Sequence, residues 1–117
     1  MRPVLRRLHS PDVEDLRTFE PPDPAFAILV QLLVGPSDAP GEESFDLVVC
    51  SPEWLRAQGR PIIGRHHLIV PNFNYDDLLS LVENYLERST GSDWKEVACK
   101  VGRLGRWEFE DYDETMA

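Results

Sequence analysis

The longest apolar run in this chain is residues 25–34, which contain a single polar residue, Gln31. Alternate residues of an extended strand point to opposite faces, so a strand here would be apolar on both faces. β-Branched residues, and a proline on either side at Pro24 and Pro36, favour a strand over a buried helix. The pattern therefore predicts a central strand that is at least partly covered on both sides.

Shorter patterns predict further strands around this run. Residues 43–50 alternate between apolar and polar, and the short turn-rich link before them implies an antiparallel hairpin with the central strand. Three other segments have the apolar content of strands: residues 2–9, 62–70 and 106–112. An acidic, proline-rich loop over residues 10–24 is expected to separate the first strand from the central one.

A short helix is predicted after the residue 43–50 strand. Ser51 followed by Pro52 is typical of a helix start, because serine caps the first turn and proline is tolerated at its first position. Gly59 would end the helix after about two turns. Trp54 and Leu55 are its expected buried residues.

Two longer helices follow. Asn74 can cap the first, and residues 90–92 would end it. Its apolar stripe at helical spacing comprises Tyr75, Leu78, Leu79, Val82, Tyr85 and Leu86. Its polar stripe comprises Asp76, Ser80, Glu83 and Glu87. The second helix is predicted over residues 93–104, with Ser92 as its cap.

This order of elements indicates an α+β domain. We expect an antiparallel sheet of four to five strands, with two long helices packed on one face and one short helix. At 117 residues, the whole chain, residues 1–117, is expected to be a single domain, since domains cluster near ~100–150 residues.

The net charge indicates which kinds of partner to expect, and the cysteines indicate the cellular compartment. The net charge is −9. Nucleic acid and anionic membranes require positive charge at the contact, so neither is an expected direct partner, whereas a basic protein would be attracted. Acidity also favours solubility in general. Cys50 and Cys99 lack metal-site spacing, and the N-terminal residues do not resemble a signal peptide, so we expect reduced thiols in a cytoplasmic protein.

Few residues offer catalytic chemistry. His66 or His67 could act with a carboxylate, or as a base for Cys50 as nucleophile. Neighbouring strand residues point to opposite faces, so the two histidines cannot easily bind one metal ion. Packing is the simpler interpretation of all three residues. The sequence contains no phosphate-binding loop or nucleophile motif, and no metal or cofactor is expected.

Acidic residues gather in two places that could recognise a basic partner. The last predicted strand and the residues after it mix acids with aromatic side chains, which suits a protein interface. The polar stripe of the first long helix is the other place. The candidate contact residues are Trp107, Glu108, Glu110, Asp111, Tyr112, Asp113, Asp76, Glu83 and Glu87. Glu108 and Glu110 could also form an acid–base pair about 7 Å apart on one strand face, although solvated surface explains both groups more simply.

Short motifs follow one another along nearly the whole chain. They are LHSPD at 8–12, EESFD at 42–46, CSPEWL at 50–55, GRHHLIV at 64–70, Trp94 with EVA at 96–98, and LGRWEFEDY at 104–112. In this order they resemble the immunity protein 8 family of bacterial polymorphic toxin systems. The resemblance implies a small cytoplasmic antidote that binds one cognate toxin domain and blocks it by occlusion, without catalysis or a cofactor.

The resemblance transfers no contact residues, so the acidic candidates rest on charge alone. Two alternatives stay open. One is a small cytoplasmic, hydrolase-like enzyme that uses His66 or His67 with a carboxylate or Cys50. The other is a structural subunit of a larger assembly.

Overall fold

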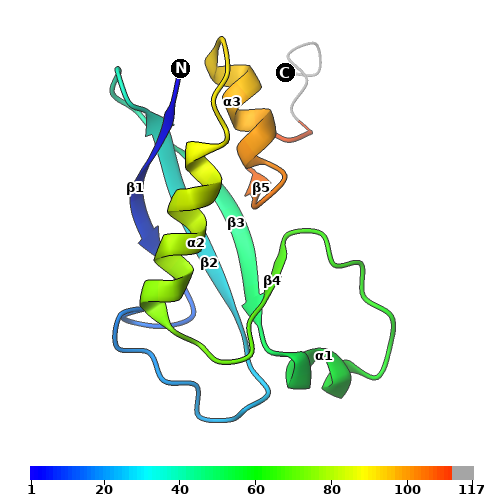
Figure 1. Ribbon diagram of the computed structural model, residues 1–117. Helices are drawn as coiled ribbons and strands as arrows, with labels where there is room; N and C mark the ends of the chain where they lie inside the picture. The colour runs from blue at the N-terminus through cyan, green and yellow to red at the C-terminus, as the bar shows by residue number, and fades with distance from the viewer. Residues whose placement is uncertain (112–117) are drawn as a thin grey trace.

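The computed structural model describes residues 1–111; the candidate contacts Tyr112 and Asp113 fall in 112–117, outside the described residues. Figure 1 shows a sheet with helices at its face and ends. The strands are β1 (Pro3–His9), β2 (Ala27–Pro36), β3 (Glu43–Cys50), β4 (His67–Ile69) and β5 (Arg106–Trp107). The helices are α1 (Pro52–Gln58), α2 (Tyr75–Glu87) and α3 (Trp94–Val101). The predicted α+β class is confirmed.

The strands form one mixed sheet in the order β1-β2-β3-β4, with β5 also paired to β3. β2 is antiparallel to both neighbours, and its register with β3 runs from Ala27↔Cys50 to Val34↔Glu43, which confirms the predicted hairpin. The outer edge of β3 is shared: β5 pairs antiparallel with Phe45 and Asp46, and β4 pairs parallel with residues 48–50.

The parallel pairing of β4 differs from the antiparallel sheet that we expected. Residues 51–66, which include α1, form a crossover between β3 and β4. A connection of a dozen or more residues allows the chain to return to the same end of the sheet and run parallel.

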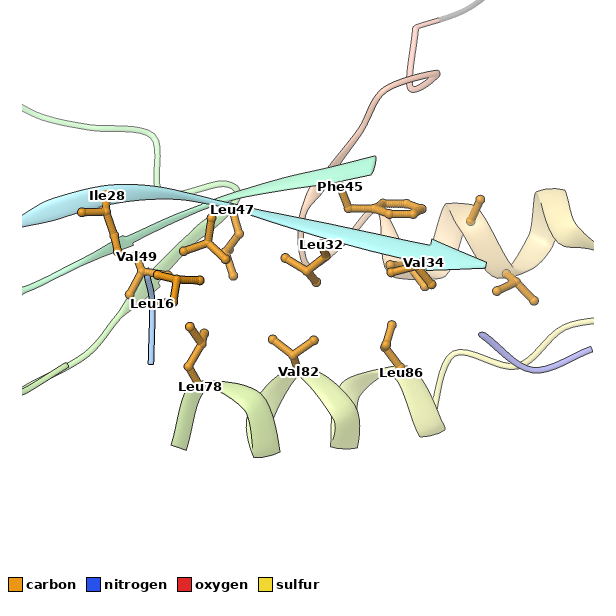
Figure 2. Packing of buried hydrophobic residues seen from close by; sticks show 14 of the residues in the cluster. Leu16, Ile28, Leu32, Val34, Phe45, Leu47, Val49, Leu78, Val82 and Leu86 are labelled. Carbon is orange, nitrogen blue, oxygen red and sulfur yellow. The ribbon is translucent and has the colours of Figure 1, made fainter. Parts of the chain in front are cut away.

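The core lies on one face of the sheet. Alternate residues of β2 and β3 are buried there: Ile28, Val30, Leu32, Val34, Phe45, Leu47 and Val49. Figure 2 shows Leu78, Val82 and Leu86 of α2 pointing toward these side chains. α3 adds Val97, Ala98 and Val101 to the same cluster. On the opposite face, Leu29 and Leu33 are half-buried, so β2 is buried on one side and partly covered on the other.

The predicted caps are largely confirmed. The Ser51 side chain accepts a hydrogen bond from the Trp54 N–H at the start of α1, and Gly59 ends that helix in the left-handed region at φ 64°. The Asn74 side chain likewise accepts from the Asp77 N–H at the start of α2. The prediction that Trp54 and Leu55 are buried is wrong, because α1 lies at the margin of the domain and none of its residues is buried.

Three predicted elements are several residues longer than the observed ones. α3 is capped by Asp93 instead of Ser92 and ends at Val101. β4 begins only at His67, since His66 takes a positive φ of 59° that a strand does not accommodate. β5 stops at Trp107, where the Glu110 N–H bonds to the Trp107 carbonyl and turns the chain.

Candidate functional site

The first acidic candidate group lies in β5 and the turn after it, which together we call the C-terminal turn (residues 106–111). Trp107, Glu108, Glu110 and Asp111 line one hollow of about 350 Å³. Arg106 and Asp46 of β3 complete its walls. The structure thus brings together the four described candidates of this group.

Glu108 and Glu110 bond in different directions. The Glu108 carboxylate accepts a 3.0 Å hydrogen bond from the Ser44 N–H, and the Glu108 N–H donates to the Ser44 carbonyl at 3.1 Å. The Glu110 carboxylate forms an ion pair with Arg65 at 2.6 Å. The prediction that the two acids share a strand face is wrong, because the strand ends before either of them. Both side chains hold the turn in place.

Trp107 anchors the C-terminal turn to the core. Its ring stacks on Phe45, with centroids 6.4 Å apart and planes 13° from parallel. Its indole N–H donates to the Glu43 carboxylate at 3.3 Å, and the indole N–H of Trp94 donates to the same oxygen. The ring of Phe109 packs edge-on against that of Trp107, with centroids 5.9 Å apart. Trp107 is consequently half-buried, and only part of its ring is open to a partner.

Asp111 has the least constrained charge in this turn. It is exposed, and its side chain has no hydrogen bond or ion pair with any other residue in the described part of the chain. Arg106 and Arg65 lie close to the other acids of the turn. Arg65 comes from outside the C-terminal turn, so the surface there is less negative than the sequence of the turn alone indicates.

The second candidate group lies along α2, and we call Asp76, Glu83 and Glu87 the α2 ridge. All three are exposed. Within residues 1–111, their carboxylates take part in no hydrogen bond or ion pair. Glu83 lines two hollows between α2 and β1, and Glu87 lines one of them. Each hollow also has at least one arginine in its lining, so the ridge borders concave surface of mixed charge.

The structure does not bring the two acidic groups together. α2 contacts β1, whereas the C-terminal turn contains β5, which pairs with the outer edge of β3. β2 lies between these two strands. The acidic candidates therefore form two separate surfaces.

The histidines and Cys50 have structural contacts. Cys50 is fully buried, and burial raises the pKa of its thiol, which is the opposite of what an activated nucleophile needs. A ring nitrogen of His66 hydrogen-bonds with the Gly102 carbonyl at 2.7 Å. His67 bonds through Nδ1 with the Arg65 carbonyl and stacks on Trp54.

In residues 1–111, no group of three or more His, Cys, Asp and Glu side chains is arranged to hold a metal ion. None of the helices in this range has the length and apolar character needed to cross a membrane.

Sequence reasoning missed one concave apolar surface. A hollow of about 470 Å³ lies between β4 and the start of α2, and its lining includes Leu81. Leu81 is 40% exposed, and it lies outside the predicted apolar stripe of its helix. The available signal was its spacing: Leu81 lies three residues after Leu78 and four before Tyr85, so it widens the apolar stripe of the helix.

Comparison with known proteins identifies the family of the chain. The family model described as Immunity protein 8 matches residues 3–112, a range that includes every strand and helix given above. Comparison with curated proteins and with solved structures found no match. Because this match covers nearly the whole chain, the chain belongs to the Immunity protein 8 family.

Proposed function

We propose that this protein binds one cognate toxin domain and blocks it by covering the surface through which the toxin acts. The observation that carries the proposal is the family match over residues 3–112. Immunity proteins protect the cell that makes the toxin, so the proposed place of action is the cytoplasm of that cell. The protein needs no catalysis or cofactor for this role, because occupying the partner's surface is sufficient.

Charge supports a basic toxin as the partner. The chain carries a net charge of −9, and its α2 ridge presents three carboxylates without internal partners. An acidic surface attracts a basic partner over several ångströms and raises the association rate. Many domains that cut nucleic acid are basic, and an acidic inhibitor would compete with the phosphates at such a surface.

The two acidic surfaces have different proposed roles. The α2 ridge, Asp76, Glu83 and Glu87, supplies free charge to the contact. In the C-terminal turn, Asp111 supplies charge and the exposed part of Trp107 supplies apolar area, while Glu108 and Glu110 mainly hold the turn. Tyr112 and Asp113 continue the same stretch of sequence and remain proposed contacts.

Coexpression with the toxin tests the proposal. The toxin domain encoded beside this gene should stop growth when it is produced alone, and growth should resume when this protein is produced with it. An unrelated toxin of the same expression level is the control and should not be neutralised. Growth arrest despite a folded, abundant protein would contradict the proposal.

Stoichiometry separates occlusion from an enzymatic mechanism. A blocker should reach full inhibition of the purified toxin at one copy per toxin, and the two proteins should elute together in gel filtration. The His66→Gln, His67→Gln and Cys50→Ala variants should inhibit equally well if they remain folded. Full inhibition at a small fraction of the toxin concentration, lost in one of these variants, would favour the enzyme alternative.

A further inference from the structure

The hollow between β4 and α2 is walled mainly by apolar side chains. They include Leu68, Ile69, Val70, Phe73, Leu78 and Leu81. In Figure 1, the chain leaves β4, makes a turn and enters the lower end of α2. Pro71, Asn72 and Phe73 of this turn line the hollow. At about 470 Å³, the space is large enough for a bulky side chain of a partner.

Two apolar side chains at the hollow are unusually exposed. Ile69 is 51% exposed and Leu81 is 40% exposed. Both belong to the small set of large hydrophobic residues exposed in the described chain, yet they come from different elements and line the same space. Apolar surface gathered around a concavity is typical of the central part of a protein interface.

The rim of this hollow is acidic. Asp77 is the one charged side chain in its lining, and Asp76 of the α2 ridge precedes it in the sequence. Both are exposed, and their side chains form no hydrogen bond or ion pair within residues 1–111. No arginine or lysine lines this hollow, whereas each of the three other hollows described above is lined by at least one arginine.

We infer that the hollow receives an apolar side chain of the cognate toxin, carried on a segment with lysine or arginine next to it. This inference rests on the proposed function and specifies the toxin's contribution to the contact. The apolar side chain would fill the hollow beside Leu81 and Ile69, and the flanking cation would face Asp77. An apolar anchor with an ionic rim is the usual arrangement of a strong contact point.

A second copy of the same chain fits the hollow less well. Each copy has a net charge of −9, and a symmetric contact here would bring the Asp77 side chains of both copies close together. Like charges opposed across an interface cost affinity. A basic partner gains from the same carboxylates.

The test measures binding of the purified toxin domain to wild-type protein and to Leu81→Gln. Glutamine keeps the helix propensity and removes the apolar contact, so the variant should bind about tenfold more weakly, mainly through faster dissociation. Ile63→Gln is the matched control: Ile63 is 87% exposed and does not line the hollow, so its affinity should stay within about twofold of the wild type.

Two further variants test the rest of the arrangement. Ile69→Thr removes apolar contact from β4 while keeping a β-branched residue, and it should weaken binding as Leu81→Gln does. Asp77→Asn should slow association and reduce its dependence on salt, because it removes rim charge. Circular dichroism and thermal melting establish that each variant is folded before its affinity is compared.

The outcomes separate the two proposals. Tight wild-type binding with unchanged affinity in folded Leu81→Gln and Ile69→Thr would overturn this inference and leave the proposed function standing. Failure of the wild type to bind or inhibit the toxin would overturn both. A concentration-dependent dimer that Leu81→Gln abolishes, measured by sedimentation, would show that a second copy occupies the hollow and would also overturn the inference.

Discussion

The guanidinium of Arg65 donates two hydrogen bonds to the carboxylate of Glu110, at 3.1 Å from Nη1 to Oε2 and 2.6 Å from Nη2 to Oε1. This contact joins the loop before β4 to the C-terminal turn. His66, the next residue, lies with Nε2 3.8 Å from the same carboxylate. Glu110 therefore has a structural partner, and a substitution there changes the fold contact as well as the surface charge.

Breaking this pair should cost little stability. The side chain of Arg65 is 62% exposed and that of Glu110 is 21% exposed, so water screens much of the attraction. We expect Arg65→Met and Glu110→Gln each to lower the free energy of unfolding by up to about 1 kcal/mol. A double-mutant cycle by urea denaturation measures the coupling, and a coupling indistinguishable from zero would contradict a stabilising pair.

Ser51→Ala should lower the free energy of unfolding by more than the loss of an exposed helix cap does. The Ser51 hydroxyl accepts a 3.2 Å hydrogen bond from the Trp54 N–H and a 3.1 Å hydrogen bond from the Phe26 N–H, which is buried. The variant would lose the cap of α1 and leave a buried donor, the N–H of Phe26 just before β2, unsatisfied. We expect a loss of about 2 kcal/mol in the free energy of unfolding.

Asn74→Ala provides the comparison for Ser51. The Asn74 side chain caps α2 through the Asp77 N–H at an exposed site, so its loss should cost about 1 kcal/mol. Equal losses in the two variants would show that the second hydrogen bond of Ser51 contributes nothing.

Two leucines of α2 should respond very differently to truncation. Leu86 is 3% exposed and Leu81 is 40% exposed. Leu86→Ala should lower the free energy of unfolding by roughly 2–5 kcal/mol, because it leaves a cavity against the sheet. Leu81→Ala should cost well under that, and its effect should appear in toxin binding instead. Denaturation of both variants checks the difference, and similar losses would contradict the assigned burial.

The carboxylate of Glu96 should make the stability of the fold depend on pH. Hydrogen bonds from the Ser92 N–H and hydroxyl, helped by Lys100, lower the pKa of Glu96 from 4.5 to about 2. Because the folded pKa is the lower one, the stabilisation is complete above the ordinary value of 4.5 and is lost as the pH falls toward 2. Glu96→Gln should therefore flatten the dependence of stability on pH across this window.

Titration of Glu96 by NMR checks the cause. In the wild type the carboxyl group should titrate near 2, and Ser92→Ala should raise its pKa because the hydroxyl donor is lost. Ser80→Ala, at an exposed position of α2, is the control and should leave the titration unchanged. A Glu96 midpoint that does not move in Ser92→Ala would contradict the assigned hydrogen bond.

Removing charge from the α2 ridge should slow toxin capture. The combined variant Asp76→Asn, Glu83→Gln and Glu87→Gln keeps the shape of the helix and removes three unpaired negative charges. We expect slower association with a basic toxin and a weaker dependence on ionic strength. Stopped-flow mixing at several salt concentrations measures both. Unchanged association would place the electrostatic contact elsewhere, with Asp111→Asn as the next variant.

The sequence by itself determined the elements whose causes are local. Alternation predicted β3 with the observed bounds, and Ser51, Gly59 and Asn74 marked helix ends because capping involves residues only a few positions apart. The apolar stripe of α2 likewise predicted Leu78, Val82 and Leu86 as core. The sequence also identified Trp107, Glu108, Glu110 and Asp111 as neighbours, and they do line one hollow.

Only the tertiary structure decided which of these side chains are free. Glu110 meets Arg65, Glu108 meets Ser44 and Trp107 meets Glu43 across long stretches of chain, and a local pattern has no access to such pairings. The crossover through α1 made β4 parallel to β3 and set it beside the start of α2. That placement created the apolar hollow around Leu81, because a concave surface depends on where distant segments meet.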